Sequence, residues 1–423
     1  MTADVSSACR ATWFLASTDF SASAAALYGA SVSVPLHTSS TPTTNSVRTT
    51  TAGAAPVTAA ASTTLSWIDS ALQDVNLRNV VWQDTQKDGV LDRGDMLGIF
   101  AQVSKDGKVS TQEFSDLQKL VANTKFFAGY DYVDVLATHV ISADPANATY
   151  QGTVLGSLKA GSSSSQLDLL VNKWFRGTDH PSTMSGVTYQ KAAGSLFPHA
   201  PTYTDVHQGY LGDCYFVASL GETALVNPSL ITSMFIVNGD GSYTVRFYHN
   251  GKADYVTVDS MLPATSAGNL VYDGLGQNVR DKNASLWVPL AEKAYTQIDA
   301  SGWLRADLGD LGHNSYSAIA GGYMTDALTQ ITDHRAGYWA VDKNTFTAAY
   351  NAHDLITFGS VTSPVDRGVV GNHAYAVVGY NASTQMVTLF NPWGINNGSS
   401  APGLVTLNWT QMKQDFSDME YAV

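Results

Sequence analysis

The chain has 423 residues, of which 44% are apolar and 14% are charged. This length is sufficient for two or three domains with sizeable cores. Its 23 basic and 36 acidic residues give a net charge of −13 at pH 7. Nucleic acids and anionic lipid surfaces both attract concentrated Lys and Arg, so the acidic balance argues against either as a partner. No run of about 20 apolar residues is present, so we predict no membrane span.

The first 64 residues are predicted to form a flexible tail. Ala, Ser and Thr dominate most of this stretch, as in HTSSTPTTNSVRTTTAGAAPVTAAASTT, and so few large apolar side chains cannot offset the entropy lost on ordering. The N-terminus has no basic region followed by an apolar stretch, so we predict no secretory signal and expect a cytoplasmic or non-classically secreted protein. Cys9 and Cys214 are expected to be free, because two cysteines fit neither a disulfide framework nor a thiolate zinc site.

A small helical domain is predicted over residues 65–175. The stretches WIDSALQDVNLRNVVW, FSDLQKLV and SQLDLLVNKWF each repeat apolar residues at three- and four-residue steps. This spacing places the apolar side chains on one face of a helix and is typical of short amphipathic helices.

Within this domain, DTQKDGVLDRGD has the spacing of an EF-hand calcium loop. Asp84, Asp88 and Asp92 fall at loop positions one, five and nine, but the twelfth residue is Asp95 instead of the bidentate Glu that usually closes the loop. A second stretch, SKDGKVSTQEF, has a similar pattern whose first loop position would be Gln102, only 18 residues after Asp84 and too close for two helix–loop–helix units. The favoured interpretation is turns and helix N-caps, with the four aspartates as weak calcium candidates; calcium is possible and no cofactor is required.

The C-terminal half predicts an α+β arrangement of two lobes. SYTVRFYHNGKADYVTVDSMLP predicts a β-hairpin, because two alternating runs flank the turn signal Asn250-Gly251. ASLWVPLAEKAYTQI predicts a helix, HAYAVVGYNASTQMVTLFNPW two strands and GLVTLNW a third. Residues 176–332 are therefore expected to form a helix-richer lobe and residues 333–423 a β-rich lobe.

Cys214 lies at the end of the stretch QGYLGDC, whose residue types suit a reactive thiol. Gly209 and Gly212 allow a tight backbone approach, and Asp213 is a favoured helix N-cap. The next residues, YFVASLGETALV, predict a buried helix that begins at Cys214. The positive end of the helix dipole favours the thiolate, which is the attacking form of cysteine. The alternative is a small buried apolar residue, as most free cysteines are.

A nucleophilic thiol needs a base, and the base needs an orienting partner. Most of the ten histidines lie in polar loop contexts, but His373 stands at the head of the apolar strand HAYAVVGY. Asn391 follows 18 residues later in NPWG, at the end of the next predicted strand. Its side-chain carbonyl can accept a hydrogen bond from the imidazole, and Trp393 could shield that bond from water. A buried structural histidine is the alternative for His373.

Together, QGYLGDCY, NHAYAVVGY and NPWG resemble, in the same order, three motifs of the calpain family of papain-like cysteine proteases. The resemblance covers roughly residues 196–409 and includes VDSMLPAT and WVPLAEKAY. It implies a papain-like two-lobed core and a calpain-like cysteine endopeptidase that hydrolyses peptide bonds of proteins or peptides. Tyr215 and Asn372 depart from the Trp and Gly that the family usually has at these positions.

The resemblance also implies a role for each motif residue. Cys214 is the expected nucleophile, His373 the general base and then acid, and Asn391 the residue that orients the imidazole. Gln208 is expected to donate its side-chain amide to the oxyanion, beside the main-chain N–H of Cys214. The supporting residues are Trp393, Gly212 and Asp213.

Other readings of the same residues stay open. A catalytically silent papain-like module would use the fold for binding, although all four catalytic positions are filled. A latent enzyme would use residues 1–175 as a regulatory or targeting extension. A transglutaminase or acyltransferase could share the geometry, but the resemblance at Asn391 and Gln208 favours peptide hydrolysis. There is no HExxH zinc helix, no GxSxG elbow and no phosphate-binding glycine loop.

Overall fold

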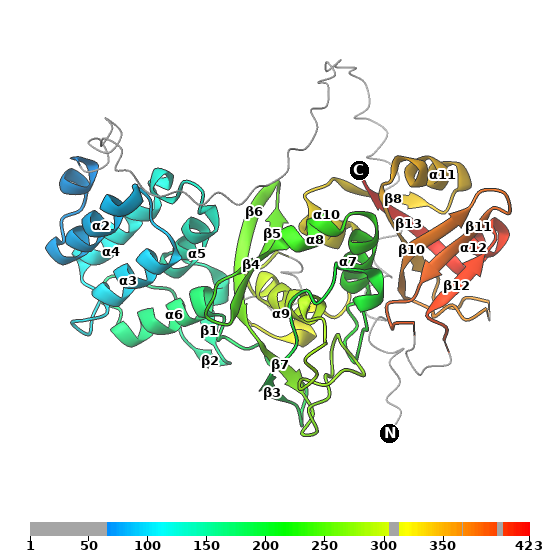
Figure 1. Cartoon of the computed structure of the whole chain (residues 1–423), viewed down its shortest axis with the longest axis horizontal. Helices are drawn as coiled ribbons and strands as arrows, with labels where there is room; N and C mark the ends of the chain where they lie inside the picture. The colour runs from blue at the N-terminus through cyan, green and yellow to red at the C-terminus, as the bar shows by residue number, and fades with distance from the viewer. Residues whose placement is uncertain (1–65, 304–312, 366, 396–400) are drawn as a thin grey trace, which may run out of the picture.

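The computed structural model describes residues 66–303, 313–365, 367–395 and 401–423. The predicted tail and Cys9 lie outside the described residues. The described residues form three regions along the long axis of the molecule: a helical region, a middle region of helices and small sheets, and a six-stranded sheet (Figure 1). The predicted α+β class is confirmed as a mixture of helices and antiparallel sheets.

The helical region contains the amphipathic helices that the apolar spacing predicts. Residues 66–71 are helical, and they are followed by α2 (Val75–Asp88), α3 (Arg93–Val103), α4 (Thr111–Val121), α5 (Asp131–Ile141) and α6 (Ser164–Arg176). Short 3-10 turns lie at Thr124–Phe127 and Pro145–Ala148, and β1 (Thr149–Tyr150) and β2 (Thr153–Val154) form a small hairpin. Local signals set the helix ends. The side chain of Asp74 accepts from the main-chain N–H of Leu77 at the start of α2, and Gly89 ends that helix with φ 87°.

Among its described residues, the middle region holds four α-helices and two small sheets. The helices are α7 (Cys214–Val226), α8 (Pro228–Met234), α9 (Trp287–Ala300) and α10 (Met324–Thr332), and 3-10 turns lie at Tyr203–Asp205 and Tyr316–Ile319. One sheet joins β4 (Phe235–Val237), β5 (Ser242–His249) and β6 (Lys252–Asp259), and the other joins β3 (Thr188–Lys191) and β7 (Met261–Ala264).

The predicted hairpin is confirmed between β5 and β6. Its turn residues Asn250 and Gly251 have φ of 52° and 72°, and His249 pairs with Lys252 on either side of them. Positive φ at both central residues defines the hairpin turn for which Asn-Gly is the preferred pair. The helix predicted from ASLWVPLAEKAYTQI is also present, as α9.

The third region is one antiparallel sheet with the strand order β12-β11-β10-β9-β13-β8. Its strands are β8 (Ala336–Ala340), β9 (Leu355–Ser360), β10 (Ala374–Asn381), β11 (Met386–Phe390), β12 (Leu404–Leu407) and β13 (Phe416–Ala422), and it carries helices α11 (Lys343–Ala352) and α12 (Trp409–Asp415). The three strands predicted from the apolar runs are therefore β10, β11 and β12.

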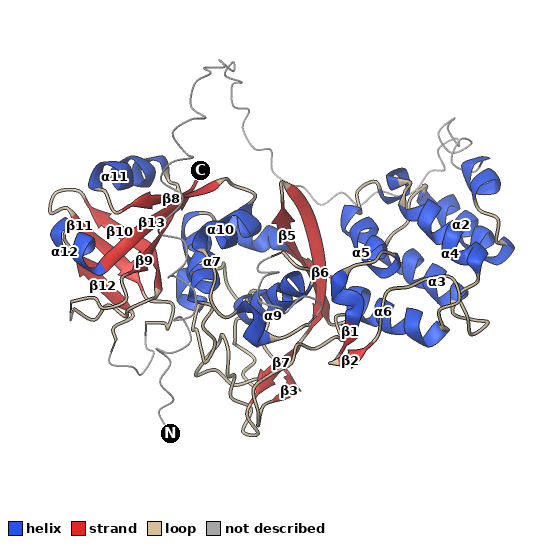
Figure 2. Ribbon diagram, turned by 180° about the vertical axis from the view of Figure 1, so that it is seen from behind, coloured by secondary structure: helices blue, strands red, loops and turns tan. Residues whose placement is uncertain are grey.

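Strand β10 joins the sheet region to the middle region, because its two faces pack against different cores. Ala374 and Ala376 belong to the large apolar cluster that runs through the helical and middle regions, whereas Tyr375 and Val377 belong to the separate core of the sheet. This alternation follows from the two-residue period of a strand. Helix α7 packs against β10 (Figures 1 and 2). The side chains of Ala374 and Ala376 are small, so they allow a close approach on this face of the strand.

Within the described parts of the chain, no helix is both long enough and apolar enough to cross a bilayer.

Candidate active site

Cys214 is the first residue of α7, and it is buried with 6% of its surface exposed. The loop before it follows a close path over the backbone of residues 271–272. A β-carbon at Gly209 would lie 2.3 Å from the carbonyl oxygens of both Val271 and Tyr272, and the N–H of Tyr210 donates to the carbonyl of Val271 at 2.9 Å. Gly209 is therefore required by sterics, as the sequence predicts.

The prediction that Asp213 caps this helix is wrong. Asp213 stands at the N-cap position with φ −100° and ψ 25°, but its side chain makes no capping hydrogen bond. The carboxylate instead lies in the interior, where its Oδ1 accepts from Gln208 Nε2 at 3.4 Å. Burial raises the pKa of Asp213 to about 7. Buried partners, which no local sequence signal reveals, outweigh the local preference for capping.

His373 and Asn391 form the central hydrogen bond of the site. His373 Nε2 lies 2.9 Å from Asn391 Oδ1, and both side chains are buried. A side-chain carbonyl can only accept, so Nε2 carries the hydrogen and Nδ1 is the basic nitrogen of the neutral ring. Asn391 is itself held, because its Nδ2 donates to Pro402 O at 3.3 Å and its Oδ1 accepts from Trp393 N at 3.1 Å.

Two aromatic rings flank the imidazole of His373. The ring centroids of Trp393 and Tyr375 each lie 5.2 Å from that of the imidazole, at interplanar angles of 52° and 88°. The Tyr375 hydroxyl accepts from Val370 N at 2.8 Å. Burial raises the pKa of Tyr375, and the nearby Cys214 raises it further when its thiol is ionised. Tyr375 is thus close enough to interact with both Cys214 and His373.

The backbone before His373 explains why Asn372 occurs in place of the family's glycine. Asn372 has φ 50°, in the left-handed region where Asn is among the best-tolerated residues after glycine. The Thr362 hydroxyl donates to Asn372 Oδ1 at 2.9 Å and holds this conformation. The glycine that sterics require is its neighbour Gly371, where a β-carbon would lie 2.3 Å from Thr362 O.

Tyr215, the other departure from the family pattern, is accommodated by a glycine. Its ring lies against Gly322, where a β-carbon would come within 2.5 Å of the ring, and its hydroxyl donates to Ile319 O at 3.2 Å. The tyrosine therefore keeps an aromatic side chain next to Cys214 and adds a polar anchor to the segment after residue 312. Gly212 is tied to the same segment, since its carbonyl accepts from Gly321 N at 2.8 Å.

Gln208 connects the cysteine loop to the asparagine loop. Its main-chain N–H donates to Pro392 O at 2.8 Å. Its side-chain Nε2 donates to Leu211 O at 2.7 Å, and its Oε1 is buried without a hydrogen-bond partner among the described residues. The two loops meet again at Gly394, which has φ 100° and where a β-carbon would lie 2.5 Å from His207 Nδ1.

Asp213 belongs to a group of three buried carboxyls beside the loop that precedes α7, and no local signal in the sequence predicts this group. Asp213, Asp273 and Glu292 are each at most 1% exposed. The main-chain N–H of Asp273 donates to both oxygens of Glu292, at 3.1 and 3.3 Å. Burial first, and repulsion by neighbouring carboxylates second, raise the pKa of Asp273 and of Glu292. Burial therefore favours the protonated form of each of the three carboxyls, which lessens the negative charge beside the loop that carries Gln208 and Cys214.

The weak calcium candidates lie in helices and caps. Asp84 and Asp88 belong to the last turns of α2, while Asp92 caps α3 and forms a reciprocal capping box with Asp95. Lys87 donates to both Asp84 and Asp95, at 2.7 and 3.0 Å. This arrangement is not an EF-hand loop, which would need residues 84–95 to be extended around the ion. Across the described ranges, no group of three or more His, Cys, Asp or Glu side chains could hold a metal ion.

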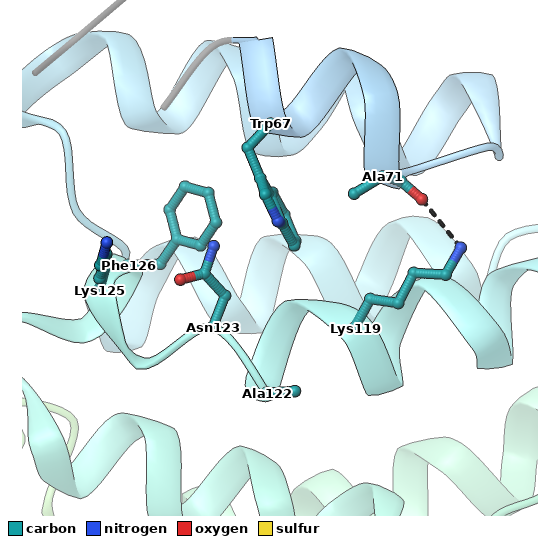
Figure 3. Close-up of a pocket in the computed structure, with 7 residues that line it drawn as sticks. All are labelled: Trp67, Ala71, Lys119, Ala122, Asn123, Lys125 and Phe126. Carbon is teal, nitrogen blue, oxygen red and sulfur yellow. Dashed lines mark hydrogen bonds between the residues drawn. The ribbon is translucent and has the colours of Figure 1, made fainter. Parts of the chain in front are cut away.

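A pocket in the helical region is separate from these residues. It has a volume of about 580 Å³, and its lining includes Trp67 and Phe126, which pack against each other with ring centroids 5.2 Å apart (Figure 3). Lys119 at its edge donates to Ala71 O at 2.8 Å and pairs with Asp116 at 3.0 Å. Its charge is therefore already satisfied, and the pocket lining carries none of the predicted catalytic groups.

Comparison with known proteins agrees with the motifs. The family described as "Calpain family cysteine protease" matches residues 157–419. The calpain-type cysteine protease ADL1 of Oryza sativa subsp. japonica is 27% identical over 274 residues, which cover 59% of this chain and 11% of the rice protein. The calpain-type cysteine protease DEK1 of Zea mays is 33% identical over 166 residues, covering 38% and 6%. Human calpain-12 is 27% identical over 214 residues, covering 45% and 27%.

The family match spans more than half of the chain, and the motif residues lie inside it. The chain therefore belongs to the calpain family of cysteine proteases. The matched stretch is only 11% of the rice protein and 6% of the maize protein.

Proposed function

We propose that this protein is a cysteine endopeptidase with a papain-like, two-lobed catalytic core. The observation that carries the proposal is the buried hydrogen bond of 2.9 Å between His373 Nε2 and Asn391 Oδ1. This bond uses Nε2 and leaves Nδ1 as the basic nitrogen of His373. His373 immediately precedes β10, and β10 packs against α7, the helix that begins with Cys214. A base oriented by an amide and placed near a helix-terminal thiol is the arrangement that nucleophilic catalysis needs.

In the proposed reaction, the Cys214 thiol transfers its proton to His373 Nδ1, and the sulfur attacks the carbonyl carbon of the scissile peptide bond. The resulting imidazolium is stabilised by Asn391 through Nε2. His373 then donates the proton to the leaving amine, which departs and leaves a thioester on Cys214. Water, deprotonated by the same nitrogen, hydrolyses the thioester and restores the thiol.

The oxyanion of each tetrahedral intermediate would accept hydrogen bonds from the main-chain N–H of Cys214 and from Gln208 Nε2. One hydrogen of Nε2 is held by Leu211 O at 2.7 Å, whereas the contact to Asp213 is long, at 3.4 Å. Because the contact to Asp213 is weak, exchanging it for a hydrogen bond from the same N–H group to the oxyanion would cost little. Preorganised donors of this kind contribute roughly 3–4 kcal/mol to acyl transfer.

The direct test is cleavage of casein by the wild type and by C214A, each with and without a calcium chelator. We expect cleavage by the wild type, prior alkylation of the thiol to abolish it, and C214A to be inactive. Equal cleavage by both proteins would refute the proposal, and a folded wild type inactive in both conditions would favour the silent-module alternative. Loss of activity with chelator alone would show that calcium is required.

A further inference from the structure

Glu222 is a buried acid in the middle of the helix that carries Cys214. It is 2% exposed, and its two carboxylate oxygens accept hydrogen bonds from main-chain amides of two different strands. Oε1 accepts from Ile356 N of β9, and Oε2 accepts from Val377 N of β10, each at 2.9 Å. A charged side chain is rarely buried without a specific role, because its desolvation is costly.

If the ladder between β9 and β10 continued, the two residues whose amides Glu222 binds would be paired, and each N–H would donate to the carbonyl of the other residue. The pairing of β9 with β10 runs through Ala374↔Gly359, Tyr375↔Phe358 and Ala376↔Thr357, and then stops. The next pair in this register would be Val377 with Ile356. The register of β10 with β11 is also irregular there, between Val377 and Gly379. The carboxylate of Glu222 thus takes the place of the next rung of the ladder and satisfies both amides.

This contact lies at comparable distances from the two proposed catalytic residues. Glu222 follows Cys214 by eight residues, which is about 12 Å along a helix. Val377 follows His373 by four residues, which is about 13 Å along a strand. Cys214 and His373 each lie on the N-terminal side of the Glu222 contact in their own segment, and α7 packs against β10. A shift of α7 along the sheet at Glu222 would therefore change the spacing between Cys214 and His373 directly.

We propose that Glu222 is a positioning residue that anchors α7 to strands β9 and β10 and so maintains the spacing between Cys214 and His373. The proposal rests on the proposed catalytic function. Only a carboxylate can satisfy both amides, since a glutamine would turn an N–H₂ group toward one of the two N–H donors. Burial raises the pKa of Glu222 to about 8, while its bonds to the two amides act against that rise.

The test compares E222Q with a matched control, D116N. Asp116 is also fully buried and accepts from two main-chain amides, Gln73 N and Asp74 N, both at 2.7 Å, but it lies in the helical region away from the site. At pH 8.5 we expect E222Q to lower kcat per active enzyme at least ~10-fold with KM within ~2-fold, equivalent to about 1.4 kcal/mol in the barrier. D116N should lower the melting temperature and leave kcat unchanged.

A second measurement reads the Cys–His spacing without any substrate. The rate of alkylation of Cys214 by iodoacetamide is measured against pH, with a C214A control for other reactive groups. A thiol paired with an imidazole reacts well below the ordinary thiol pKa of about 8.5, so the wild type should show a reactive limb at low pH that E222Q lacks. If E222Q does not fold, E222D is used, because it keeps the carboxylate but shortens its reach by one methylene.

The possible failures are distinguishable. If E222Q or E222D loses stability but keeps the wild-type kcat and alkylation profile, the anchor is purely structural and the inference is overturned. If the wild type itself lacks the low-pH limb and cleaves casein no better than C214A, it is the proposed catalytic function that fails.

Discussion

Replacing Asn391 with alanine tests the part of the proposed triad that the structure describes most directly. Asn391 is fully buried, and its Oδ1 accepts from His373 Nε2 at 2.9 Å and from Trp393 N at 3.1 Å. N391A removes the acceptor for the buried imidazole N–H and for the main-chain N–H of the partly buried Trp393. An unsatisfied buried donor costs about 1–3 kcal/mol, so we expect the free energy of unfolding to fall by at least about 1–3 kcal/mol.

The effect of N391A on the reaction follows from the same bond. The hydrogen bond from His373 to Asn391 stabilises the transition state by about 1–3 kcal/mol if its full energy acts there. Its loss would then lower kcat roughly 5- to 150-fold, since about 1.4 kcal/mol in the activation barrier is a factor of ten in rate. KM should change little, because Asn391 is buried behind His373. Peptide hydrolysis is measured with the enzyme concentration set by titration of the reactive thiol, below the melting temperature of N391A. A folded N391A with wild-type kcat would refute the role of Asn391 as the orienting residue.

Three further substitutions probe other contacts. G209A should lower kcat at least ~10-fold or prevent folding, because the loop must shift by more than a few tenths of an ångström to relieve contacts of 2.3 Å; wild-type kinetics and melting would contradict this. W393A should lower kcat several-fold by admitting water to the His373–Asn391 bond, with W393F as the conservative control, and no change in kcat would exclude a shielding role. His139 bridges Asp144 and Asp254, at 2.7 and 2.6 Å; burial opposes its charge, but these carboxylates outweigh that effect and raise its pKa to about 10. The charged His139 therefore contributes a few kcal/mol to the free energy of unfolding, and this contribution is complete below about pH 6.5 and lost as the pH rises through 10. Urea unfolding of the wild type should show this loss of stability, and unfolding of H139Q should not. An equal pH dependence of the two proteins would disprove the role of His139.

Local sequence signals predicted much of the secondary structure and the residues of the candidate site. The Asn-Gly turn between the alternating runs of β5 and β6, the apolar spacing of the amphipathic helices and the apolar runs of β10 and β11 act over a few residues, so they can be recognised along the chain. Cys214, His373 and Asn391 stand out because each combines a reactive or orienting side chain with the start or end of a predicted element. Their spatial relation could be stated only through the resemblance to a family.

The tertiary structure decided which of several chemically reasonable roles each polar side chain takes. Asp213 has the residue type and position of a helix cap but joins buried Asp273 and Glu292 instead, and Asp92 and Asp95 form a capping box where the spacing also suited a calcium loop. Glu222 appears in the sequence only as a polar residue in an apolar helix. Its role depends on two amides more than 130 residues away. Burial and long-range hydrogen bonds assign these roles, and neither is encoded in the residues next along the chain.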